Sequence, residues 1–73
     1  MKDNTIGEIL IGLRKESGKS VTETAKELDI STSALSMYEN GERIPRDNIK
    51  IRIANYYHKS VTDIFFTQNA HET

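Results

Sequence analysis

Cysteine is absent from the 73 residues, so the chain contains neither a disulfide framework nor a thiolate metal site. Only two histidines are present, His58 and His71, and they fall on unrelated segments, which argues against a metal centre with converging ligands. Paired carboxylates, a Ser-His-Asp arrangement and a glycine-rich phosphate loop are also missing. We therefore expect no metal, no cofactor, no small-molecule ligand and no enzymatic activity.

Long apolar stretches are missing too, and the longest apolar runs are only a few residues. Such runs are too short to cross a membrane, and the amino-terminal residues lack the basic-then-apolar layout of a signal peptide. The sequence therefore predicts a cytoplasmic protein with no membrane contact. Hydrophobic content of 36%, charged content of 29% and only five Gly and Pro residues together predict one small folded domain.

An excess of positive charge is also lacking, because the net charge is −1. This weighs against a nucleic-acid partner, since phosphate neutralisation dominates affinity for DNA. Basic residues nevertheless gather near one predicted turn and after the central stretch, namely Lys15, Lys19, Arg43, Arg46, Lys50 and Arg52. A local basic rim of this kind can attract a polyanion, although the same pattern is typical of an ordinary solvated surface.

Apolar residues at helical spacing, together with capping signals, predict an all-α fold, a compact bundle of five short helices. The expected helices run from Thr5 to about Ser17, from Ser20 to Asp29, from Ser31 to about Asn40, from Asp47 to Tyr57, and from a cap at Ser60 over Val61 to Phe65. This bundle is expected to occupy residues 5–66. Residues 67–73 are polar and aperiodic, which predicts a mobile tail.

The central stretch 20–41 contains two predicted helices joined by the turn Asp29-Ile30-Ser31. Asp29 tolerates a left-handed backbone better than most residues, and Ser31 can cap the following helix. In a helix-turn-helix, one such helix braces against the DNA backbone and the next enters the major groove. Any small helical bundle can contain such a pair, so the layout alone leaves a function without DNA open.

The residues of this stretch resemble those of the Cro/CI-type helix-turn-helix regulators, also called the xenobiotic-response-element type. The resemblance covers Thr5 to about Phe66, and its most specific parts are Ala25, the ending Tyr38-Glu39-Asn40-Gly41 and the close Ser60-Val61-Thr62-Asp63-Ile64-Phe65. It implies a lambda-repressor-like DNA-binding domain whose helix-turn-helix is formed by the second and third predicted helices.

The resemblance also implies an ion pair between the first and third predicted helices, which by position joins Arg14 to Glu39. The spacing agrees with this independently. Arg14 follows Leu10 by four residues, and Glu39 follows Leu35 by four, so each is expected to lean toward the core. We therefore expect a partly buried pair, whereas two solvated side chains are the alternative.

Positions that contact DNA are implied by the same resemblance. The base-reading positions fall on Thr32, Ser33, Ser36 and Met37, whose hydroxyls and apolar thioether can contact several base edges and a thymine methyl. Phosphate contacts are expected from the amides of Ser20, Val21 and Thr22 and from Asn40, Arg43 and Arg46. The competing explanation for the hydroxyl residues is that they are ordinary exposed polar residues with no role in binding.

Four residues depart from the pattern of the family. Val21 stands where a phosphate-binding glutamine is common, so either the backbone binds that phosphate or nothing at this position does. Thr24 replaces a usual leucine and Lys59 a usual apolar residue, which leaves open how the second and fifth helices pack. His58 stands where a glycine usually ends the fourth helix.

The resemblance implies a sequence-specific transcriptional regulator, most simply a repressor that binds double-stranded DNA as a homodimer. Ile51, Tyr56 and Phe66 are left over from the intramolecular face and are candidates for the dimer surface, although plain exposure explains them nearly as well. Activation through polymerase, control by a protein antirepressor, and control of a restriction-modification, phage or mobile-element operon all remain open. The alternative function is an antitoxin or interaction module whose main partner is a protein.

Overall fold

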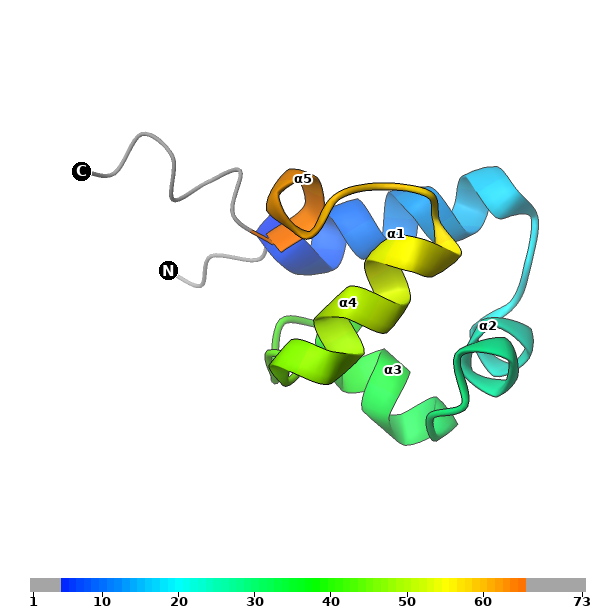
Figure 1. The fold of residues 1–73 in the computed structure, drawn as a ribbon. Helices are drawn as coiled ribbons and strands as arrows, with labels where there is room; N and C mark the ends of the chain where they lie inside the picture. Colours follow the sequence, from blue (N-terminus) through cyan, green and yellow to red (C-terminus); the bar gives the residue numbers. More distant parts are fainter. Residues whose placement is uncertain (1–4, 66–73) are drawn as a thin grey trace.

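The computed structural model describes residues 5–65, and these residues form five helices and no strand (Figure 1). The helices are α1 (Thr5–Ser17), α2 (Val21–Leu28), α3 (Thr32–Glu39), α4 (Asp47–Tyr56) and α5 (Val61–Phe65). The predicted all-α bundle is thereby confirmed, and the helix ends fall within about one residue of their expected positions. Phe66 and the predicted tail 67–73 lie outside the described residues.

Side-chain caps place the starts of α2 and α3. The Ser20 hydroxyl accepts a hydrogen bond from the Glu23 amide at 3.1 Å, while the Glu23 carboxylate accepts one from the Ser20 amide at 3.0 Å. This is the predicted capping box, which satisfies two amides at the helix start. Ser31 caps α3 in the expected way, because its hydroxyl accepts from the Ala34 amide at 3.0 Å.

Left-handed backbone conformations end several of the helices. Asp29 has a φ of 63° at the end of α2, as its position in the turn predicts. His58, which follows α4, has a φ of 59°, in the region that costs an L-residue about 1–2 kcal/mol. The backbone at His58 therefore has the conformation for which glycine is best suited.

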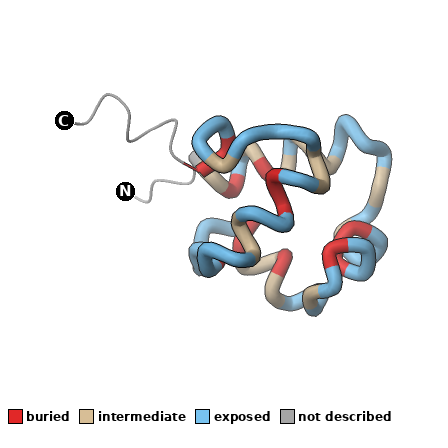
Figure 2. The backbone as a smooth tube through the Cα atoms, viewed as in Figure 1, coloured by how far each residue is buried: buried red, intermediate tan, exposed pale blue. Residues whose placement is uncertain are grey.

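A single core joins all five helices, as the buried segments in Figure 2 show. Its nine buried apolar residues are Leu10, Ala25, Leu28, Leu35, Tyr38, Ile53, Ala54, Ile64 and Phe65. Helix α3 packs against α1 and α2, α2 also contacts α4, and α5 packs on α1 and α4. The α2 and α3 pair consequently lies on the side of the molecule away from α5 (Figure 1).

Candidate nucleic-acid interface

Helices α2 and α3 have eight residues each and are joined by the predicted turn. Within this turn the Asp29 amide donates to the Lys26 carbonyl at 3.1 Å, and the Ile30 amide donates to the Ala25 carbonyl at 3.0 Å. The Ala25 and Leu28 side chains of α2 are almost fully buried, as is Leu35 of α3. The helix pair is therefore held as one unit against the core, and its outer side remains accessible.

The four proposed base-reading residues all lie on this outer side of α3. Thr32 and Ser33 are exposed, and Ser36 and Met37 are half-buried. These four residues form an uncharged surface of three hydroxyls and one thioether, which can contact base edges.

The start of α2 provides fewer free amides than the sequence suggested. The Ser20 amide is occupied by the Glu23 carboxylate, so the expectation that it is free for a phosphate is wrong. Val21 and Thr22 are the first two residues of α2, and the first amides of a helix have no partner within it. The amides of Val21 and Thr22 are therefore the ones that an anion can reach.

The loop after α3 contributes exposed basic side chains that follow this helix closely in the sequence. Asn40 is the C-cap of α3, and Arg46 is the N-cap of α4. Both residues and Arg43 between them are exposed, and neither arginine forms an ion pair with another described residue. This loop can therefore present two unneutralised guanidinium groups to phosphate.

Other basic residues of the rim are engaged within the protein. The Nη1 of Arg52 donates to the Leu28 carbonyl at 2.9 Å and to the Asp29 carbonyl at 3.4 Å. Lys19 bonds both carboxylate oxygens of Glu27, at 2.8 and 3.0 Å. Fewer basic side chains of the rim are therefore available to bind DNA than the sequence suggests. The sequence gives the number of charges but does not show which side chains have partners within the protein.

Arg14 and Glu39 form a bidentate ion pair that holds the end of α3 to α1. Arg14 Nε lies 2.8 Å from Glu39 Oε2, and Arg14 Nη2 lies 3.2 Å from Glu39 Oε1. The third nitrogen of the guanidinium, Nη1, donates to the Lys19 carbonyl at 3.0 Å. Only 6% of the Glu39 side chain and 15% of the Arg14 side chain are exposed, so the pair is largely shielded from water.

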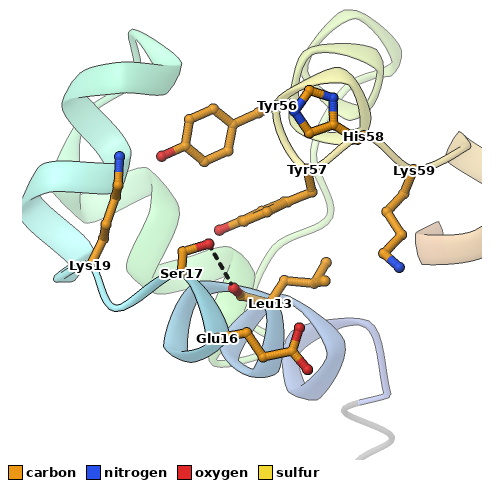
Figure 3. Close-up of a pocket in the computed structure, with 8 residues that line it drawn as sticks. All are labelled: Leu13, Glu16, Ser17, Lys19, Tyr56, Tyr57, His58 and Lys59. Atoms are coloured by element: carbon orange, nitrogen blue, oxygen red, sulfur yellow. Dashed lines mark hydrogen bonds between the residues drawn. The ribbon is translucent and has the colours of Figure 1, made fainter.

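An open hollow lies between the end of α1 and the end of α4, lined by residues that include Leu13, Ser17 and Tyr57 (Figure 3). The Ser17 hydroxyl donates to the Leu13 carbonyl of its own helix at 3.0 Å. Burial raises the pKa of Tyr57 to about 12, so its phenol stays neutral at physiological pH. The Ser17 hydroxyl and the Tyr57 ring, which packs against the core, are therefore engaged within the fold.

Tyr56 is tied to the protein by a cluster with Lys19 and Glu27 that the sequence did not indicate. Its hydroxyl donates to Glu27 Oε1, and Lys19 Nζ lies 6.0 Å from the centre of its ring. Hydrogen bonds from Lys19 and then Tyr56 lower the pKa of Glu27, and the bond to Glu27 raises the pKa of Lys19. As a dimer candidate Tyr56 is thereby weakened, because it packs against the core and its hydroxyl is used.

Ile51 is the dimer candidate that the structure leaves accessible, with 52% of its surface exposed. Ile44, in the loop after α3, is 68% exposed and is a further accessible apolar residue. Helical spacing identifies apolar residues that lie off the buried face of a helix, so it could not identify a residue in a loop. Phe66 lies outside the described residues.

Residues 5–65 contain neither a metal site nor a membrane-spanning helix. No group of three or more His, Asp or Glu residues in this part of the chain is placed to hold a metal ion. The longest described helix has 13 residues, and none has the length and apolar character needed to span a bilayer.

Comparison with known proteins adds one finding to this geometry. A family model described as "Helix-turn-helix" matches residues 10–64, a range that includes α2, the turn and α3 in full. The comparisons with curated proteins and with solved structures gave no match.

Proposed function

The chain belongs to the Cro/CI-type helix-turn-helix family of DNA-binding transcription regulators, and we propose that it is a cytoplasmic repressor that binds an operator as a homodimer. The observation that supports this best is the α2–turn–α3 unit, whose buried side is fixed in the core and whose outer side carries unpaired polar groups. In such a unit the second helix enters the major groove. Occlusion of a promoter is the simplest consequence of binding.

The proposed reading of DNA combines weak base contacts with backbone contacts. Thr32, Ser33, Ser36 and Met37 would face the bases, and none of them has the two parallel hydrogen-bonding groups that make bidentate readout selective. Phosphates would be bound by the amides at the start of α2 and by Asn40, Arg43 and Arg46. Groove shape and deformability would then account for a larger share of the specificity than in readers with bidentate contacts.

The first prediction concerns DNA binding itself. Selection from a random pool of duplexes should enrich one motif, and binding to that motif should weaken steeply as salt rises, because each neutralised phosphate releases counterions. The double variant Arg43→Gln/Arg46→Gln lacks both guanidinium groups. It should reduce the slope of log K against log salt by about 0.9 for each phosphate that is no longer neutralised. The measurement is a binding titration at several salt concentrations.

Serine variants serve as the matched control for this prediction. Ser33→Ala and Ser36→Ala should alter the preferred motif and leave the salt slope unchanged, since these side chains carry no charge. A pool from which no motif is enriched would contradict the proposed function. It would favour the interaction module or antitoxin instead.

The interaction module remains the second candidate because the basic surface is small. The net charge is −1, and Lys19 and Arg52 are engaged within the protein. A partner protein could therefore be the main ligand of the same unit. Contacts to polymerase or to an antirepressor, and control of a phage or mobile-element operon, stand as further proposals.

The second prediction concerns the homodimer, which we place on the exposed side of α4. Ile51→Asp should weaken dimerisation about tenfold or more, because burial of an isoleucine against a partner is replaced by burial of a charge. Sedimentation at micromolar concentration, in solution and on DNA, measures this. Thr62→Asp on α5 adds the same charge at another exposed position and should leave the dimer intact. A wild-type protein that is monomeric in both settings would refute the dimer.

A further inference from the structure

Arg52 joins α4 to the turn between α2 and α3. Its Nη1 lies 2.9 Å from the carbonyl oxygen of Leu28, the last residue of α2, and 3.4 Å from that of Asp29, its C-cap. The next helix begins only three residues after Asp29, at Thr32. The guanidinium therefore bonds the backbone at the start of the turn that leads from α2 into α3.

The carbonyl groups at the end of a helix lack partners within the helix and form the negative end of its dipole. A guanidinium is a suitable donor there, because it is charged and cannot lose its proton. The Asp29 and Ile30 amides of the turn bond back to the preceding turn of α2 and so reach no other helix. Arg52 is thus the described side chain that ties these carbonyls to another helix.

Arginines from α1 and α4 contact the chain near either end of α3. The Arg14–Glu39 pair fixes its carboxyl-terminal end to α1. Ahead of its amino-terminal end, Arg52 bonds the carbonyls of Leu28 and Asp29, four and three residues before Thr32. Leu35 and Tyr38 pack α3 into the core, so the contact from Arg52 acts on the direction in which the chain enters α3. A change in that direction would tilt the base-reading side chains.

We propose that Arg52 is a positioning residue for base recognition, which sets the angle of α3 and so determines specificity without itself contacting DNA. This inference rests on the proposed function. The competing role is a direct phosphate contact, because Arg52 is exposed as well as bonded. The two roles differ in what they do to binding. Loss of a positioning residue weakens binding only to the DNA sequence that α3 recognises. Loss of a phosphate contact weakens binding to every sequence and lowers the salt dependence of binding.

The test compares Arg52→Gln and Arg52→Lys with wild type on the selected motif and on a random-sequence duplex of equal length, over a salt series. Both variants should bind the motif about tenfold more weakly than wild type, which is the size of effect expected from the loss of one base contact. Their affinity for random DNA should stay within about twofold of the wild-type affinity. Their salt slopes should equal the wild-type slope. Arg52→Lys keeps the charge and most of the stem, so it also covers the case in which Arg52→Gln does not fold.

Arg46→Gln is the matched control, because it removes an arginine proposed to contact phosphate. It should weaken binding to both DNAs alike and lower the salt slope by about 0.9 for each phosphate that is no longer neutralised. If Arg52→Gln behaves like Arg46→Gln, with weaker binding to both DNAs and a lower salt slope, Arg52 is a phosphate contact and the inference is overturned. An unchanged preference in both Arg52 variants overturns it as well. Failure of the proposed function is distinct, since wild type itself would then show no preference for any motif.

Discussion

Replacing Arg14 by alanine is expected to lower the free energy of unfolding by about 3 kcal/mol, because it leaves the shielded Glu39 carboxylate without its partner. The variant also removes the donor to the Lys19 carbonyl. For a domain of this length, such a destabilisation corresponds to a Tm lower by roughly 12–24 °C. Thermal unfolding followed by circular dichroism measures it. Because small domains are marginally stable, a large part of the variant should be unfolded near body temperature.

Two comparisons separate the pair from a general effect of removing charge. Lys19→Ala breaks an ion pair whose side chains are 38% and 45% exposed, and it should change the Tm far less. The double variant Arg14→Met/Glu39→Leu should recover most of the stability, since apolar side chains can replace a buried pair without a stranded charge. An Arg14→Ala protein that melts at the wild-type temperature would show that Glu39 is effectively solvated.

Local signals in the sequence were sufficient to predict the elements of the candidate interface. Ser20 and Ser31 cap the helices that they were expected to cap, and Asp29 has the left-handed backbone that its place in the turn predicts. These features depend on residues within four positions of one another, where side-chain chemistry acts directly on the backbone. The outer face of α3 followed from the same local reasoning, since helical spacing determines which residues share a side.

Contacts between distant segments could not be predicted in the same way. Arg52 and Leu28 are 24 residues apart, and Tyr56 and Glu27 are 29 apart. Helical spacing shows which face a residue lies on but not which helix end that face meets. The sequence alone therefore places Arg52 in the basic rim and Tyr56 among the candidates for the dimer surface. The pairing of Arg14 with Glu39 could be predicted because the resemblance to the family indicates which two residues pair. Helical spacing alone shows only that each of them leans toward the core.

Replacing Thr24 by valine is expected to raise the free energy of unfolding by about 1–3 kcal/mol. Thr24 is 0% exposed, and its hydroxyl oxygen is buried without a hydrogen-bond partner among the described residues. The hydroxyl gives up its bonds to water on folding and forms none in return. Valine has nearly the same shape and removes this penalty, so the Tm should rise by several degrees or more.

Variants of neighbouring chemistry show whether the hydroxyl itself is responsible. Thr22→Val makes the same change at an exposed position of α2 and should shift stability by no more than about 0.5 kcal/mol. Thr24→Ser keeps the hydroxyl but removes a buried methyl group, so it should lower stability by about 1 kcal/mol. A Thr24→Val protein that is less stable than wild type would mean that the hydroxyl is satisfied in solution, by a buried water between α2 and the core. The order Val, Thr, Ser from most to least stable therefore distinguishes an unpaired hydroxyl from a bonded one.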